Sequence, residues 1–170
     1  AGGTVYSALP YFWTPGPKHD LTQVIGDPER GKYVARIGGC FACHTNLKKS
    51  GVPLAGGRVI KTPFGNFHTP NITPDQETGI GDWSLADFSQ ALTKGLHPDG
   101  SHYYPAFPYA SYTKMNRQDI ADLKAYLDTV PPTLNKIAGH DLRSPFNIRR
   151  GLSVWKAFYF DPKPWENNRE

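Results

Sequence analysis

The sequence lacks any apolar run long enough to cross a membrane, since no stretch of about 18 apolar residues occurs among its 170 residues. Dense clusters of lysine and arginine are missing as well. The formal net charge is +4, and adjacent basic residues occur only as the pairs Lys48–Lys49 and Arg149–Arg150. We therefore expect no transmembrane segment and no nucleic-acid partner. A mildly basic chain favours anionic partners, mostly by raising the rate of encounter.

Cysteine is almost absent, and the two that exist, Cys40 and Cys43, are followed at once by His44. This C-x-x-C-H spacing is typical of c-type haem attachment. Two thiols three positions apart reach both vinyl groups of one haem, and the adjacent imidazole then lies under the iron as its fifth ligand. No second C-x-x-C-H occurs, so we predict one covalently bound haem c, with Cys40, Cys43 and His44 in its site.

Three other interpretations of the cysteines stay open at this stage. They are a disulfide between Cys40 and Cys43, a thioredoxin-like redox site and a structural zinc site. A thioredoxin-like site needs a βαβ pattern nearby, and none is visible. A zinc site needs further ligands, usually a second pair. Such ligands would have to come from the remaining histidines, which are His19, His68, His97, His102 and His140. Of these, only His97 and His102, with four residues between them, have a spacing found in zinc sites.

Methionine is nearly absent too, and Met115 is the only one in the chain. A thioether is a soft ligand that favours ferrous iron, so a His/Met pair raises the reduction potential. We predict that the iron is held between His44 and Met115. Met115 as a gap-filling core residue is one alternative. A histidine as the sixth ligand is another, with all five remaining histidines as rivals, and it would give a lower potential.

Helix-capping signals divide the rest of the chain. A first helix is expected after Asp27, with Tyr33, Val34 and Ile37 on one face. A second is expected after Ser84, and the clearest helix spans about residues 117–129. Glycine and proline are abundant, with 17 and 16 residues, so we expect mostly loop over residues 45–82 and 96–114. Loops of that length are usually ordered by something else, and a haem face would do so.

Three regions follow from this pattern. We expect an N-terminal arm over residues 1–26, a haem domain over residues 27–132, and a C-terminal extension over residues 133–170 that packs on the domain. Residues 153–160 of the extension are apolar and aromatic, which indicates a short helix.

The order of helix, C-x-x-C-H, long loop, methionine and terminal helix resembles a class I cytochrome c domain. The resemblance implies a mostly α fold with long loops and extended terminal arms. It also implies that the first and last helices cross near a glycine and an aromatic residue. Gly31 is placed for that crossing, opposite Leu123 and Tyr126.

Several loop sequences point to a narrower group. They are TPFG at 62–65, TPNITPD at 69–75, TGIGDW at 78–83 and YPAFPY at 104–109. Together they resemble the first haem domain of the cytochrome subunits of membrane-bound alcohol and gluconate dehydrogenases, over about residues 28–160. The resemblance implies that the methionine after the tyrosine-rich loop, here Met115, is the iron ligand. Those subunits typically carry three haems, whereas this chain has one attachment motif.

The function expected from these residues is electron transfer by a single-haem carrier that is not itself an enzyme. Haem of this type is attached after export into an oxidising space, so we expect a periplasmic location. The expected partner is a redox protein: a dehydrogenase, another cytochrome or an oxidase. Basic residues Lys48, Lys49 and Arg58 are candidates for steering it, and Trp83, Tyr109 and Arg58 for binding the haem propionates.

Two other functions are weighed against this one. A haem enzyme or ligand sensor would need a displaceable sixth ligand, and a non-haem module would carry a Cys40–Cys43 disulfide instead.

Overall fold

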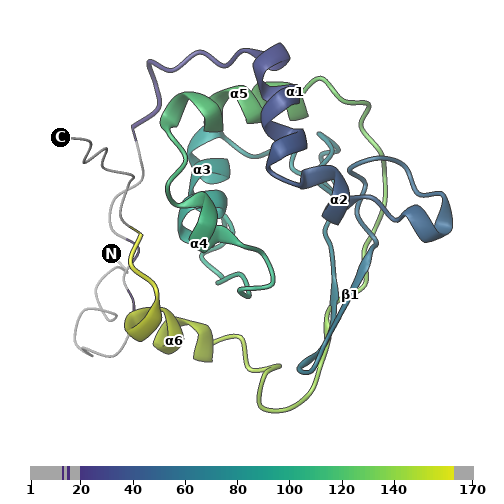
Figure 1. Cartoon of the computed structure of the whole chain (residues 1–170), viewed down its shortest axis with the longest axis vertical. Coiled ribbons are helices and arrows are strands. Elements are labelled where there is room, and N and C mark those ends of the chain that lie inside the picture. The colour runs from purple at the N-terminus through teal and green to yellow at the C-terminus, as the bar shows by residue number, and fades with distance from the viewer. Residues whose placement is uncertain (1–12, 14, 16–19, 163–170) are drawn as a thin grey trace.

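The computed structural model describes residues 13, 15 and 20–162 (Figure 1). Most of the expected N-terminal arm and residues 163–170 therefore lie outside the described residues. The mostly helical class predicted from the sequence is confirmed. No helix in the described part of the chain has the length and apolarity needed to cross a membrane. The helices are α1 (Pro28–Ile37), α2 (Cys40–His44), the 3₁₀ turn Leu47–Lys49, α3 (Leu85–Lys94), α4 (Tyr109–Tyr112), α5 (Arg117–Leu127) and α6 (Gly151–Tyr159).

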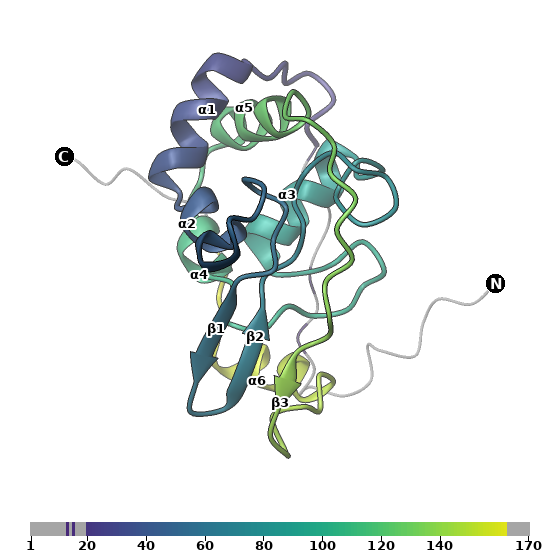
Figure 2. The same ribbon diagram turned by 90° about the vertical axis from the view of Figure 1, so that its right-hand side faces the viewer.

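Helices α1 and α5 pack directly against each other at one end of the molecule (Figures 1 and 2). Gly31 lies at their crossing, where a Cβ atom would come within 1.9 Å of the carbonyl oxygen of Asp122 and 2.7 Å of the Cβ of Tyr126. The crossing predicted from the sequence is therefore present. Of the three apolar residues expected on one face of α1, Val34 is buried, while Tyr33 and Ile37 are each 66% exposed.

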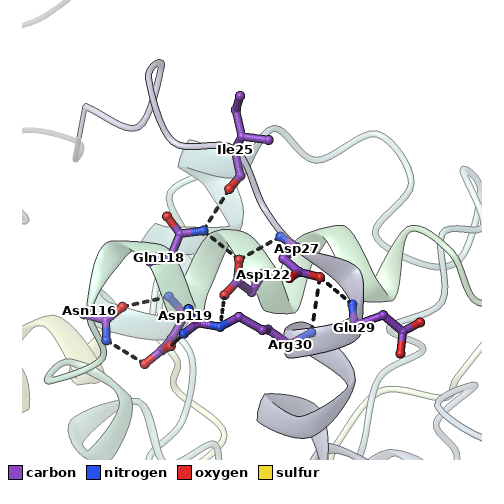
Figure 3. Close-up of polar contacts among 8 residues, drawn as sticks. All are labelled: Ile25, Asp27, Glu29, Arg30, Asn116, Gln118, Asp119 and Asp122. Atoms are coloured by element: carbon purple, nitrogen blue, oxygen red, sulfur yellow. Dashed lines mark hydrogen bonds and ion pairs between the residues drawn. The ribbon is translucent and has the colours of Figure 1, made fainter.

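A buried carboxylate joins the same two helices (Figure 3). The Asp122 side chain is fully buried on α5. It accepts hydrogen bonds from the backbone N–H of Asp27, at 2.7 Å, and from Nε2 of Gln118, at 2.7 Å. Arg30 reaches it from α1, with its Nε 3.2 Å from Oδ2 of Asp122. Buried carboxylates need such partners, and here they fix the start of α1 against α5.

The predicted caps are present at all three helices. Asp27 accepts from the backbone N–H groups of Glu29 and Arg30 at the start of α1. Ser84 and Asp87 form a reciprocal capping box at the start of α3, and Asn116 accepts from Asp119 N–H at the start of α5. The helices enclose one apolar core made of Val34, Ala35, Leu54, Ile80, Phe88, Leu92, Ile120, Leu123 and Leu127.

The prediction of mostly loop over residues 45–82 is partly wrong, because this segment contains an antiparallel hairpin. Strands β1 (Val59–Thr62) and β2 (Gly65–His68) pair with Ile60 opposite Phe67. A third strand, β3 (Asp141–Leu142), pairs with β2 in the order β1-β2-β3. Figure 2 shows the chain running from the end of α5 beside the hairpin to β3. The extension thus lies against residues far earlier in the sequence.

The end of the extension also contacts the domain, through α6. Lys156 on α6 is fully buried. Its Nζ donates to the carbonyl oxygens of Lys94, at 2.7 Å, and Gly95, at 2.8 Å, at the end of α3. The ammonium lies 4.6 Å from the ring centre of Tyr109 and 5.7 Å from that of Phe160. These hydrogen bonds and ring contacts anchor α6 to the domain.

Candidate functional site

The C-x-x-C-H motif forms the short helix α2, directly after a sharp change in chain direction. Gly39 makes that change with a φ of 74°, a left-handed conformation that glycine adopts at low cost. On a helix, positions three and four apart share a face, so Cys40, Cys43 and His44 lie together. All three line one cavity of about 380 Å³.

His44 is oriented by a backbone carbonyl. Its Nδ1 lies 2.8 Å from the carbonyl oxygen of Pro70. A carbonyl oxygen only accepts, so Nδ1 carries the proton and Nε2 keeps its lone pair. Burial lowers the pKa of His44, although the Pro70 contact opposes the shift. The imidazole is therefore held neutral with one nitrogen available, which is the state in which histidine binds iron.

Cys40 and Cys43 are free thiols in this structure and form no disulfide. Burial raises the pKa of the Cys40 thiol to about 11. Among the described residues, no group of three or more His, Cys, Asp or Glu side chains is placed to hold a metal ion. The zinc interpretation therefore finds no ligand set there. A βαβ unit is missing from the described elements, so the thioredoxin-like interpretation finds no support either.

The cavity is walled mainly by apolar side chains from many parts of the chain. Large aliphatic and phenyl groups from both strands, α3, α5 and the loops contribute; they are Ile60, Phe67, Ile72, Ile80, Phe88, Leu92, Phe107, Leu123, Leu127 and Ile137. Volume and lining are those of a small-molecule or cofactor site. Two thiols, an oriented imidazole and a large apolar cavity together fit a covalently attached haem.

Met115 is not brought to this cavity. It lies between α4 and α5 and lines a second, separate depression formed with α1, beside Tyr33 and Ile37. Its backbone N–H donates to the carbonyl oxygen of Tyr112, at 2.9 Å. Tyr112 lines both hollows, and its hydroxyl donates to the carbonyl oxygen of Gly38, at 2.6 Å. Ligation of iron by Met115 therefore stays a prediction.

The rival histidines divide into two groups. His68, His97 and His140 line the cavity. His102 does not, and its ring instead packs edge-on against Trp13. His19 lies outside the described residues.

Of the three residues proposed for the propionates, only Trp83 lines the cavity. Arg58 is turned to the carbonyl oxygen of Ala42, and Tyr109 faces Lys156. Sequence reasoning did not place Arg149 at the cavity, and it considered His140 only as one of five possible iron ligands; both residues line the cavity from the extension. The pair Arg149–Arg150 was visible as a basic pair, but nothing local in the sequence indicates its approach to the cavity.

Comparison with known proteins gives a family and several relatives. A family model for cytochrome c matches residues 28–131. A diheme cytochrome c-type protein of Cereibacter sphaeroides is 48% identical over 142 residues, which covers 82% of this chain and 48% of the relative. The cytochrome c subunit of a quinone alcohol dehydrogenase of Gluconobacter oxydans is 42% identical over 132 residues, covering 77% of this chain and 27% of the relative.

A third relative is the cytochrome c subunit of gluconate 2-dehydrogenase of Pantoea cypripedii. It is 40% identical over 132 residues, which covers 77% of this chain and 30% of the relative. The chain thus spans half or less of the length of these relatives. The resemblance drawn from the loop sequences, to cytochrome subunits of alcohol and gluconate dehydrogenases, is confirmed.

Proposed function

Because the chain belongs to the cytochrome c family, we propose that it carries single electrons on one haem c. In this proposal Cys40 and Cys43 form the two thioether bonds and His44 is the fifth iron ligand. The observation that carries it is their convergence on one apolar cavity, with Nε2 of His44 left free by the Pro70 contact.

The residues around the cavity suit electron transfer. When bound, haem supplies an iron that changes its oxidation state by one electron. Pro70 fixes the plane and tautomer of His44, so the fifth ligand keeps its geometry in both oxidation states. The aliphatic and aromatic walls exclude water, so few solvent dipoles reorient when the charge changes.

Met115 is proposed as the sixth ligand, as its chemistry predicts. It is the only thioether in the chain, and the segment that carries it adjoins the cavity-wall residue Tyr112. The rival proposal is one of the histidines already at the cavity wall, His68, His97 or His140.

A second candidate function follows from the position of Met115 outside the cavity. If neither Met115 nor one of the histidines at the cavity wall binds the iron, the sixth position of the iron would be open, as in a haem protein that binds small gases. Prompt binding of carbon monoxide to the reduced protein at neutral pH would favour this candidate. Resistance to carbon monoxide would favour the carrier.

The domain division, location and partner are proposed with the carrier function. Residues 27–132 form the haem domain, residues 1–26 an N-terminal arm, and residues 133–170 an extension packed on the domain. Haem attachment of this kind needs an oxidising compartment, so the protein works in the bacterial periplasm. Because several relatives are named as cytochrome subunits of dehydrogenases, its partner is a dehydrogenase or another respiratory redox protein.

The first experiment measures covalent haem on the intact chain matured in a host able to attach haem c. Mass spectrometry should give the polypeptide plus one haem, and the alkaline pyridine spectrum should be that of haem c. Cys43→Ser should lose one thioether bond, while the control Ala42→Ser, at an exposed position within the motif, should keep both. A colourless wild-type protein with the bare polypeptide mass would end the proposal.

The second experiment identifies the sixth ligand. With Met115 bound, the ferric protein shows a sulfur-to-iron charge-transfer band, and Met115→Leu abolishes it because no other methionine exists. The same variant lowers the reduction potential. Absence of the band in the wild type would transfer the role to a histidine, which single glutamine variants at 68, 97 and 140 would then identify.

A further inference from the structure

The described lining of the cavity contains almost no charged side chains. Among the described residues that line it, Arg149 is the only one of the types Asp, Glu, Lys and Arg. A haem carries two carboxylates on its propionate groups. A site that takes up those carboxylates needs cationic or hydrogen-bonding partners, because unpaired charge near apolar walls is costly. Arg149 is the one permanent cation in the described lining.

Arg149 lies in a small polar group at one end of the cavity. Its guanidinium carbon is 5.5 Å from the ring centre of Tyr104. The Tyr104 ring packs against His140, with ring centres 5.6 Å apart. Nδ1 of His140 accepts from the backbone N–H of His68, at 3.2 Å. Burial lowers the pKa of His140, and Arg149 and His68 lower it further. The charge of the Arg149 guanidinium therefore acts on the His140 ring in the cavity wall.

The elements beside this polar group are not those beside the attachment motif. Arg149 lies two residues before α6, and His140 directly precedes β3. Figure 2 shows β3 and α6 at one end of the molecule and α2 towards the other, with the hairpin running between them. In haem the propionates occupy the edge opposite the two vinyl groups. If Cys40 and Cys43 hold the vinyl edge, the propionate edge points away from α2.

We propose that Arg149, with His140 beside it, binds the haem propionates. The inference rests on the proposed haem function and adds a specific anion site to it. Arginine suits the role because its planar fork of N–H donors matches a carboxylate with two parallel hydrogen bonds. The family model ends at residue 131, so this site comes from the extension and not from the shared domain.

Other titratable groups face the same region and enter the design of a test. His68, His140, Tyr103 and Tyr104 line the cavity near Arg149. His97 also lines it, with its Nδ1 2.9 Å from an exposed carboxylate oxygen of Asp99. The pKa of Tyr103 is raised above its usual value, chiefly by burial, so Tyr103 stays neutral at physiological pH. A curve measured against pH must therefore be assigned with variants of the side chains around Arg149.

The test is the pH dependence of the reduction potential of the haem-loaded protein. Protonation of a propionate raises the potential, so the potential falls with pH around the propionate pKa. Arg149→Gln removes the cation that favours the ionised form, and the inflection should move up by about 1 pH unit. Arg149→Lys, which keeps the charge but loses the fork, should shift it less. The matched control Arg150→Gln, at an exposed residue outside the cavity lining, should leave it in place.

The outcomes distinguish a failure of the Arg149 assignment from a failure of the proposed haem function. If the wild type binds no haem, the proposed function fails first. If haem is bound but Arg149→Gln and Arg150→Gln give the same curve, Arg149 is not a propionate partner. His140→Gln checks the histidine: the inflection should persist in this variant. Its disappearance would show that His140 itself titrates, and would overturn the assignment.

Discussion

Replacing Gly31 by alanine is expected to destabilise the protein, because the substitution forces α1 and α5 apart. The added Cβ would lie 1.9 Å from the carbonyl oxygen of Asp122 and 2.5 Å from its carbonyl carbon. Both are backbone atoms of α5 that no rotamer change can remove. Ordinary contact begins near 3.4 Å, so the helices must separate locally by about 1.5 Å.

The magnitude follows from two opposing terms. Overpacking of a close contact costs about 3 kcal/mol at the upper end of its usual range. Alanine in a helix interior gains about 1 kcal/mol over glycine. The net loss is about 2 kcal/mol, before any weakening of the hydrogen bond from Asp27 N–H to Asp122. For a chain of this size that lowers the melting temperature by roughly 4–8 °C.

The measurement is urea unfolding of the haem-loaded protein, followed by far-UV circular dichroism. Gly151→Ala is the matched control, because Gly151 is also helical and a Cβ there meets nothing within 4 Å. That substitution should stabilise by about 0.5 kcal/mol through the unfolded state. Equal stability changes in the two variants would refute the reasoning from the helix crossing.

Three further outcomes are expected. Ser84→Ala should cost about 1 kcal/mol of unfolding free energy in urea titration, because it removes the capping box with Asp87. Asp122→Asn should cost about 1 kcal/mol in the same assay, because it removes the ion pair with Arg30, whose side chain is 60% exposed; a neutral result would contradict that pairing. Burial lowers the pKa of Lys156 to about 7 from 10.5, so the unfolded chain binds the extra proton between these values and stability should rise with pH across that window. Lys156→Met should flatten the rise measured by thermal unfolding, and an unchanged pH profile would exclude Lys156 as its source.

The helix ends could be predicted because the signals that set them are local. Asp27, Ser84 and Asn116 each bond to N–H groups two or three residues ahead, so a short window of sequence contains both partners. Gly31 was also predictable, as an unexplained glycine in a helix that needs a close neighbour. The exposure of Tyr33 and Ile37 could not be predicted. The spacing of apolar residues does not show how much of a helix face its partner helix covers.

The rest of the site depends on contacts between residues far apart in the sequence. The β1–β2 hairpin lies in a stretch rich in glycine and proline, and its third strand begins at Asp141. His140 and Arg149 reach the cavity only because the chain after α5 turns back along the hairpin. Met115 has the right chemistry, but the turn before α5 directs it towards α1. Residue type alone was enough to place Cys40, Cys43 and His44 in one site. It was not enough to place His140 and Arg149 at the same cavity.

The wall supplied by residues 137–149 has a consequence for any shortened form of the protein. Ile137, Ala138, His140 and Arg149 are the last of the described residues that line the cavity. A chain that stopped before residue 137 would keep Cys40, Cys43 and His44 but would lack this part of the lining. The attachment motif and the complete pocket are thus encoded by separate parts of the sequence.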